Sequence, residues 1–186
     1  MRENRRVLVG MSGGIDSSIV CVLLQKRGFE VVGVTMRMWD SQRHFKEGDI
    51  EPDYILSARR LAQQLGIVHH VIDARALFKS EVVDYFTSEY LNGRTPNPCV
   101  VCNKFLKFGA FLEKSKEMGF DYIATGHYAK IVFDAETKRY NLVKSSLEKK
   151  DQSYFLYNMT QEILSHMIFP LADFENKDDV RALAEK

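Results

Sequence analysis

The sequence predicts an α/β protein with a doubly wound parallel sheet, and three observations lead to that class. Short β-branched runs alternate with helical segments from residue 6 onward. Glycine follows several of the helical segments, as it does at helix ends. The first strand passes into the first helix through a glycine-rich turn, where proteins of this class bind ligands. With 186 residues, 45% of them hydrophobic, the chain suits one domain with a real core.

The elements follow one another as strand, turn and helix. We expect strands at 6–10, 30–36, 67–72 and 122–125, and helices at 15–26, 53–65, 79–91 and 102–118. Residues 92–98 are expected to form a loop. Because strands alternate with helices, we expect right-handed crossovers and helices on both faces of the sheet.

Beyond Gly126 the pattern changes. Residues 129–133 and 139–143 predict a β-hairpin, and the rest of the chain is expected to be helical, with an amphipathic helix from Asn176 onward. We therefore separate a core region, 1–145, from a helical extension, 146–186. The sequence stops at Lys186 without the Gly or Asn that usually closes a helix, which favours a fragment.

Composition and charge exclude several classes of protein. Lys and Arg total 26 against 25 Asp and Glu, so binding of nucleic acid must use a local patch. Three cysteines are too few and too odd in number for a disulfide framework, which favours a reducing compartment. No apolar run approaches the roughly 20 residues of a membrane helix, and no secretion signal is visible. We expect a cytoplasmic protein without a membrane partner.

The glycine-rich turn, Gly10-Met-Ser-Gly-Gly-Ile-Asp-Ser-Ser18, predicts a phosphate site. Its glycines allow a tight turn with exposed N–H groups, and Asp16 falls in the first turn of the following helix. Amides and the positive end of the helix dipole converge there. No Lys follows Gly14 and the glycine spacing is not the dinucleotide fingerprint, which excludes two common phosphate loops. The alternative is a purely structural turn.

A second motif, at 92–104, combines two prolines with Cys99 and Cys102 at the mouth of a helix. The helix dipole and nearby cations are expected to stabilise both thiols as thiolates, which favours nucleophilic or ligand chemistry. The cations are Arg94, Lys104 and Lys107. The remaining thiol, Cys21, lies among apolar residues of the first expected helix and is expected to be a core residue.

Residues 12–18, Ser-Gly-Gly-Ile-Asp-Ser-Ser, resemble the signature of the PP-loop ATP pyrophosphatases, which split ATP while adenylating a carbonyl oxygen. Further motifs make nearly the whole chain similar to the tRNA-specific 2-thiouridylase (MnmA-type) family: Gly93-Arg-Thr-Pro-Asn-Pro98, Cys102-Asn103, Lys107-Phe108, Ala124-Thr-Gly-His-Tyr128 and Lys150-Asp-Gln-Ser-Tyr-Phe155. In that family ATP activates the C2 carbonyl of a wobble uridine, and sulfur relayed as a persulfide replaces the oxygen.

The resemblance implies ATP and magnesium as cofactors, and tRNA and a protein that donates sulfur as a persulfide as partners. Region 1–145 would be the PP-loop ATP-binding catalytic domain, and 146–186 would lead into a central domain outside this sequence. The residues implied in ATP binding are Gly10, Met11, Ser12, Gly13, Gly14, Ile15, Asp16, Ser17, Ser18, Met36 and Gly126.

The resemblance also assigns residues to the metal, the target base and catalysis. Asp16 would bind magnesium, and Cys102 would be the nucleophile, with the persulfide cysteine downstream of this sequence. A flipped target base suits the reaction because its C2 oxygen cannot be reached inside a stack. The base pocket would include Asn97, Pro98 and Cys99, and the residues that touch tRNA would be His127, Lys150, Asp151 and Gln152.

Several alternatives stay open. Many members of the family carry Asp where this chain has Cys99, so this thiol could be a base-pocket residue, a catalytic sulfur relay, or a ligand of an iron–sulfur cluster. A zinc site is disfavoured, since no histidine has the required spacing, and His127 could be structural. Two other functions are another adenylating PP-loop enzyme, such as a lysidine synthetase or an amide-forming ligase, and a redox or metal-binding module.

Overall fold

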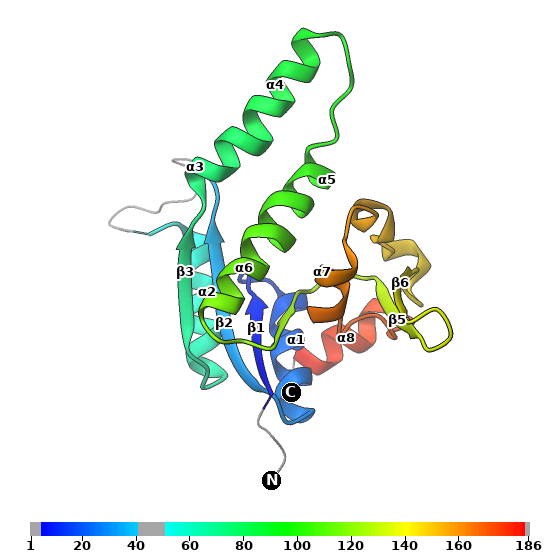
Figure 1. Ribbon diagram of the computed structural model, residues 1–186. Coiled ribbons are helices and arrows are strands. Elements are labelled where there is room, and N and C mark those ends of the chain that lie inside the picture. The colour runs from blue at the N-terminus through cyan, green and yellow to red at the C-terminus, as the bar shows by residue number, and fades with distance from the viewer. Residues whose placement is uncertain (1–4, 41–50, 185–186) are drawn as a thin grey trace.

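A five-stranded parallel sheet forms the centre of the protein, in the order β3-β2-β1-β4-β7. The computed structural model describes residues 5–40 and 51–184, and Figure 1 shows the sheet with helices around it. The predicted α/β class with a parallel sheet is confirmed. The strands are β1 (Arg6–Gly10), β2 (Glu30–Arg37), β3 (His69–Asp73), β4 (Tyr122–Ala124) and β7 (Met167–Ile168).

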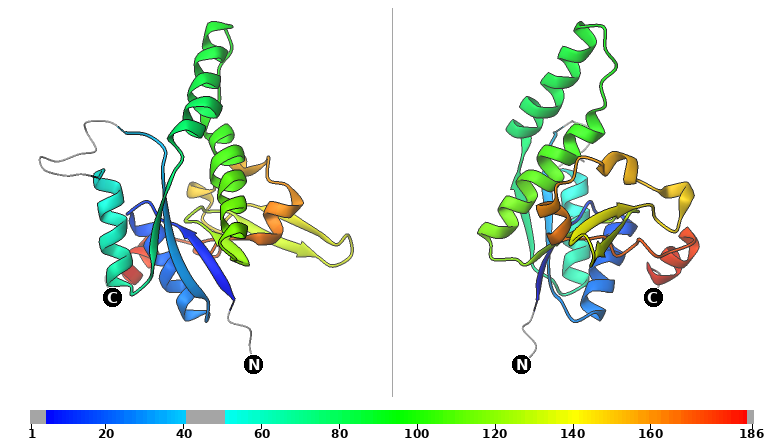
Figure 2. Two further views of the ribbon diagram at one scale, coloured as in Figure 1. Left: turned by 60° about the vertical axis from the view of Figure 1, so that its left-hand side comes forward. Right: turned by 45° about the vertical axis from the view of Figure 1, so that its right-hand side comes forward.

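Helices cover both faces of the sheet, as the two views in Figure 2 show. Val7 and Val9 of β1 are fully buried in a cluster with helices α1 (Ile15–Lys26), α2 (Asp53–Gln64) and α8 (Lys177–Ala184). Leu8 points to the other face and packs in a second cluster with α6 (Phe111–Glu117) and α7 (Gln161–His166). The alternation along one strand therefore places a helical layer on each side.

Two long helical segments rise from the sheet as an arm (Figure 1). The first consists of α3 (Arg75–Phe78), the π-helical segment η2 (Lys79–Val83) and α4 (Asp84–Leu91). The second consists of α5 (Pro98–Cys102), the π-helical segment η3 (Asn103–Ala110) and α6. It begins earlier than the expected residue 102, because the Asn97 side chain caps it by accepting a hydrogen bond from the Val100 N–H at 3.3 Å.

The expected hairpin is confirmed as β5 (Lys130–Asp134) and β6 (Arg139–Val143), paired antiparallel apart from the main sheet. The expectation of an all-helical remainder is wrong at Met167–Ile168, which pairs with β4. Short 3-10 segments η4 (Glu148–Lys150) and η5 (Ser153–Leu156) precede α7. The extension 146–186 therefore contributes a strand to the main sheet, and its division from 1–145 stays a prediction.

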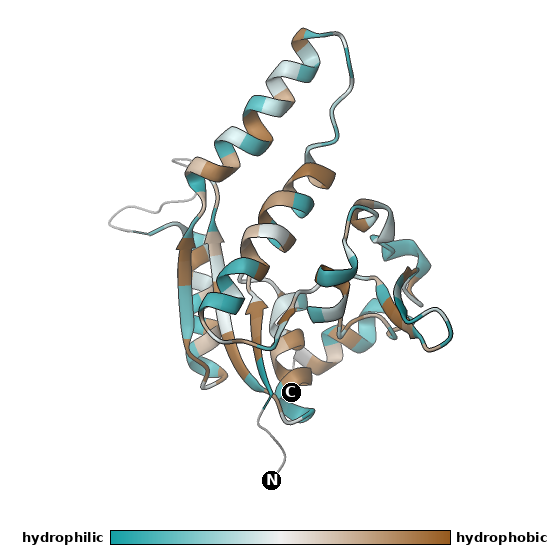
Figure 3. Cartoon of the chain, viewed as in Figure 1, coloured by the Kyte–Doolittle hydropathy of each residue, from teal (hydrophilic) through white to brown (hydrophobic). Residues whose placement is uncertain are grey.

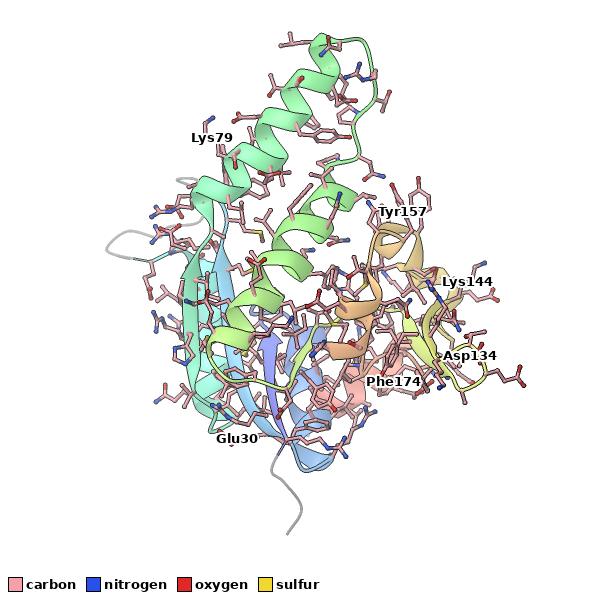
Figure 4. All side chains as sticks on the ribbon, viewed as in Figure 1. Glu30, Lys79, Asp134, Lys144, Tyr157 and Phe174 are labelled. Atoms are coloured by element: carbon pink, nitrogen blue, oxygen red, sulfur yellow. The ribbon has the colours of Figure 1, made fainter. Side chains whose placement is uncertain are left out.

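The apolar strands in Figure 3 mark the core between the helical layers. Cys21 belongs to it as expected, because its side chain is fully buried and burial raises its pKa to about 12. Glu30 begins β2 and Lys79 lies shortly after β3, so they mark the amino and carboxyl ends of the strands in Figure 4. In the described part of the chain, no helix is both long and apolar enough to cross a membrane.

Candidate active site

A cavity of about 340 Å³ opens at the carboxyl ends of β1, β2 and β4. This is the edge where parallel α/β sheets bind ligands. Its wall combines polar groups of the glycine-rich turn with apolar side chains of β2 and α6. The lining residues are Gly10, Met11, Ser12, Asp16, Ser17, Val34, Thr35, Met36, Met38, Tyr54, Lys107, Phe111, Thr125, Gly126, His127 and Gln152.

The structure separates the implied ATP-binding residues into two groups. Those that line the cavity are Gly10, Met11, Ser12, Asp16, Ser17, Met36 and Gly126. Gly13, Ile15 and Ser18 instead line a separate groove between α1 and α2, and Gly14 lines neither. The first group therefore carries the geometric support for a nucleotide site.

The glycine-rich turn has the local geometry of an anion site. Gly13 has a φ of +77°, and a Cβ there would lie only 2.9 Å from the Ser57 Cβ, so the turn needs glycine at this position. The Ser17 hydroxyl donates to the Gly14 carbonyl oxygen at 3.0 Å and accepts from the Ser12 N–H at 3.3 Å. The first N–H groups of α1 have no partner inside the helix, so they are available to an anion.

Among the described residues that line this cavity, Asp16 is the one carboxylate. Tyr128 donates its hydroxyl to one Asp16 oxygen at 3.2 Å, and the Lys177 Nζ lies 3.5 Å from the other. Burial, and next the Asp16 charge, raise the pKa of Tyr128 to about 12, so it stays a donor. A single carboxylate beside phosphate oxygens suits Mg²⁺, which is often held by one or two carboxylates, substrate phosphates and water.

A second cavity, of about 330 Å³, opens at the start of α5. Both thiols lie in its wall: Cys99 is exposed and Cys102 partly buried. Three of its residues also line the first cavity, namely Lys107, His127 and Gln152. The remaining lining residues are Phe78, Val82, Pro98, Asn103 and Phe155. The glycine-rich turn and Cys102 are therefore on the same side of the molecule, in adjoining cavities.

The expected thiolate character of Cys102 is wrong for this structure. Burial raises the pKa of its thiol above the ordinary value, and this outweighs the opposite effect of Lys107. Arg94 does not act on the thiols as expected, because its guanidinium binds Glu89, five residues earlier, at 2.7 Å. The Lys104 Nζ lies 4.7 Å from the ring centre of Phe105.

His127 lies partly buried in the wall that the two cavities share. Its Nδ1 is 2.8 Å from the Thr125 hydroxyl, and its ring packs against Phe108 and Phe169. Burial, with a smaller contribution from Lys107, lowers its pKa to about 3. The imidazole is thus neutral at pH 7. It is packed as a structural residue would be, and it also faces both cavities, where it could contact a ligand.

Only some of the implied base and tRNA residues come together. Gln152 faces both cavities, while its Oε1 accepts from the Tyr128 N–H at 3.0 Å, which leaves the side-chain NH₂ as the donor group. Asp151 accepts from the Ser145 N–H at 2.8 Å and shapes a local turn. Asn97 and Lys150 line neither cavity; Asn97 caps α5, and Lys150 is exposed.

The residues present do not by themselves hold a metal cluster at the thiols. In the ranges 5–40 and 51–184, no group of three His, Cys, Asp or Glu side chains could bind a metal ion. Cys99 and Cys102 supply two ligands, whereas a cluster with one open iron needs three.

Several lining residues have no role assigned from the sequence. Thr35 and Met38 follow from the position of β2, because the carboxyl end of a central strand faces the ligand edge. Lys107 appears in the sequence as a nearby cation and in the Lys107-Phe108 motif, without a role of its own. Tyr54 carries no local signal, and Phe155 belongs to the motif at 150–155, which assigns it no role. The remaining ones are Val34, Phe78, Val82, Asn103, Phe111 and Thr125.

Residues 5–186 match the family model described as tRNA methyl transferase HUP domain. The chain is 49% identical over 188 residues to tRNA-specific 2-thiouridylase MnmA of Clostridioides difficile. It is 51% identical over 190 residues to tRNA-specific 2-thiouridylase MnmA 1 of Caldanaerobacter subterraneus. Each comparison covers all of this chain and 52% of the relative, so the chain spans about half the length of these relatives.

Solved structures share the fold at low identity. A predicted subunit of a tRNA methyltransferase from Methanocaldococcus jannaschii superposes with a TM-score of 0.53 at 21% identity, covering 97% of this chain and 74% of that one. The NH3-dependent NAD synthetase of Campylobacter jejuni gives 0.55 at 15% identity, covering 98% and 64%. These likenesses support the architecture described above.

Proposed function

The chain belongs to the tRNA methyl transferase HUP domain family, and from this premise we propose that it supplies the ATP site and the reactive thiol for replacing the C2 oxygen of a tRNA uridine with sulfur. The observation that carries the proposal is the shared wall between the nucleotide cavity and the cysteine cavity. The names of the relatives at about half identity, tRNA-specific 2-thiouridylase, support the same reaction.

The first cavity suits ATP from one end to the other. Its apolar end, with Val34, Met36 and Phe111, matches an adenine ring, and its polar end at Ser12 and Ser17 matches phosphates. The amides and dipole of α1 favour negative charge at that polar end. Magnesium fits beside Asp16, which is the carboxylate at the same end.

The first chemical step is adenylation of the base. The C2 carbonyl oxygen attacks the α-phosphorus of ATP, the bond to the bridging oxygen of the β-phosphate breaks, and pyrophosphate leaves with the electron pair. The base must sit in the second cavity and aim C2 at the first. Pro98 and Phe155 offer an apolar wall for a nucleobase that has left its stack, and Gln152 offers an N–H donor.

The second step transfers sulfur at Cys102. Its thiolate attacks the inner sulfur of a carrier persulfide and forms a disulfide with the carrier, while the terminal sulfur leaves as hydrosulfide. The hydrosulfide adds to C2 and AMP departs with the C2 oxygen, so the base gains sulfur. A thiol reductant then returns the disulfide to two thiols. Cys102 and Lys107 both line the second cavity, which supports this assignment.

The site geometry favours this reaction over the alternatives. A lysidine synthetase or an amide-forming ligase would share the glycine-rich turn but has no use for Cys99 and Cys102 in the adjoining cavity. A redox or metal-binding module would use the thiols but has no use for the cavity at the turn. The family description refers to methyl transfer, whereas the relatives' names refer to thiolation, and the two thiols favour thiolation.

The test is a reaction of the complete protein with ATP, magnesium, a persulfide donor and unmodified tRNA. We measure pyrophosphate release and, by mass spectrometry of nucleosides, 2-thiouridine. We expect Cys102→Ser to release pyrophosphate but form no 2-thiouridine, and Cys21→Ala, a change in the core, to retain both. Normal thiolation by Cys102→Ser would reject the nucleophile. Failure of the wild-type protein to release pyrophosphate would reject adenylation.

A further inference from the structure

Lys107 occupies a singular position in the site. It is the only cationic side chain among the described residues that line either cavity, since His127 is neutral at pH 7. No carboxylate of the described residues forms an ion pair with it. Asp16, the carboxylate of the first cavity, is already paired with Lys177 and Tyr128. The Lys107 charge is therefore available to a ligand.

The π-helical segment η3 explains why Lys107 faces the thiol. Cys102 and Lys107 are five residues apart, and in an α-helix such residues point about 140° away from each other. A π-helical turn repeats its hydrogen bonds at five residues, which brings side chains at this spacing onto one face. Both residues line the second cavity, as this geometry requires.

The π-helical turn is accommodated by a glycine. A Cβ at Gly109 would lie 2.9 Å from the Lys104 carbonyl oxygen, closer than a side chain can approach a backbone atom without displacing it. π-helical turns inside α-helices frequently mark functional sites. Here the π-helical turn places the Lys107 side chain where the two cavities meet.

We propose that Lys107 is a catalytic residue that stabilises negative charge in both half-reactions. This inference rests on the proposed function. During adenylation the ammonium group faces the oxygens of the α-phosphate, where charge accumulates as pyrophosphate leaves. During sulfur transfer the same group faces the thiolate of Cys102. One cation serves two steps because it lies in the wall that both cavities share.

The two roles have separate readouts. Lys107→Met removes the charge and retains an unbranched side chain of similar length, and Lys107→Arg restores a charge. Lys114→Met is the matched control, since Lys114 lies on the same helical segment, is exposed and pairs with Glu117 at 2.8 Å. Chemical denaturation of every variant establishes that the fold is retained.

The first measurement does not depend on activity. The pH dependence of iodoacetamide labelling reports the pKa of the Cys102 thiol, with fragment-ion mass spectrometry of the tryptic peptide 95–104 to distinguish it from Cys99. We expect Lys107→Met to raise this pKa by about one unit, and Lys107→Arg and the Lys114 control to leave it near the wild-type value. No change in Lys107→Met would overturn the role of Lys107 at the thiol.

The second measurement is pyrophosphate release with unmodified tRNA, under saturating ATP. We expect Lys107→Met to slow it by roughly 10²-fold to 10³-fold, as loss of a preorganised charge contact does, with partial recovery in Lys107→Arg. An unchanged rate would overturn the adenylation role. If the wild-type protein released no pyrophosphate, the proposed function would fail, while the labelling experiment would still decide whether Lys107 acts on the thiol.

Discussion

Lowering the pH from 7 to 5 should destabilise the protein through His127. Its folded pKa of about 3 lies below the ordinary value of 6.5 because the ring is buried. Above pH 6.5 the imidazole is neutral in both states and has little effect on stability. Below it the unfolded chain binds a proton that the folded chain excludes, so the free energy of unfolding falls as pH falls toward 3. Between pH 7 and 5 the loss is about 2 kcal/mol.

The assay is urea denaturation at several pH values for the wild-type protein, His127→Gln and His70→Gln. Other groups titrate in the same range, including His69, whose pKa burial also lowers. Subtracting the free energy of unfolding of a variant from that of the wild-type protein at each pH therefore isolates the contribution of the substituted residue. We expect the difference between wild type and His127→Gln to change by about 2 kcal/mol from pH 7 to 5. His70 is exposed, so His70→Gln controls for the loss of an imidazole at the surface. A pH-independent difference for His127→Gln would refute the reasoning.

Two further predictions concern the cavities. Gly126→Ala should weaken ATP binding about tenfold in a calorimetric titration. The added Cβ would lie 3.2 Å from the Asp16 carbonyl carbon and would press the loop after β4 onto the glycine-rich turn. Unchanged affinity would count against this placement of the nucleotide. In the native protein, iodoacetamide at pH 8 should label the exposed Cys99 faster than the partly buried Cys102, and Cys21 slowest of the three, as followed by mass spectrometry. Faster labelling of Cys102 than of Cys99 would contradict the burial argument.

Elements with local signals at both ends could be predicted from the sequence. Helix α1 occurs at residues 15–26 as expected, because the glycine-rich turn precedes it and Gly28, with a φ of +82°, follows it. Strand β7 could not be predicted. It has two residues, too few to show a period, and it exists because β4 offers a free edge from a distant part of the chain. The π-helical segments also lack a sequence pattern that separates them from α-helix.

The site was predictable in its components but not in its electrostatics. The sequence places Cys102 near several cations, and proximity along the chain suggests a lowered pKa. The fold instead buries the thiol in a wall that includes Phe155, more than fifty residues away in sequence. Arg94 is engaged by Glu89, five residues earlier in the sequence. Burial depends on contacts between distant segments, so local sequence could not reveal the sign of the pKa change.

The protonation states of Cys102 and His127 before the reaction predict how the rate of sulfur transfer depends on pH. Cys102 has a raised pKa, and His127, in the same wall, has a pKa of about 3. Proton transfer from this thiol to this imidazole would run far against the difference between the two pKa values, so His127 is not the base. The proton must leave to solvent or to a reactant.

We therefore expect the rate of 2-thiouridine formation, measured from pre-adenylated tRNA in single-turnover experiments, to rise about tenfold per pH unit from pH 7 toward the pKa of Cys102. Lys107→Met should shift that rise to higher pH. A rate independent of pH over this range would mean that the thiol is ionised before the reactants bind, and the burial of Cys102 would then not control the reaction.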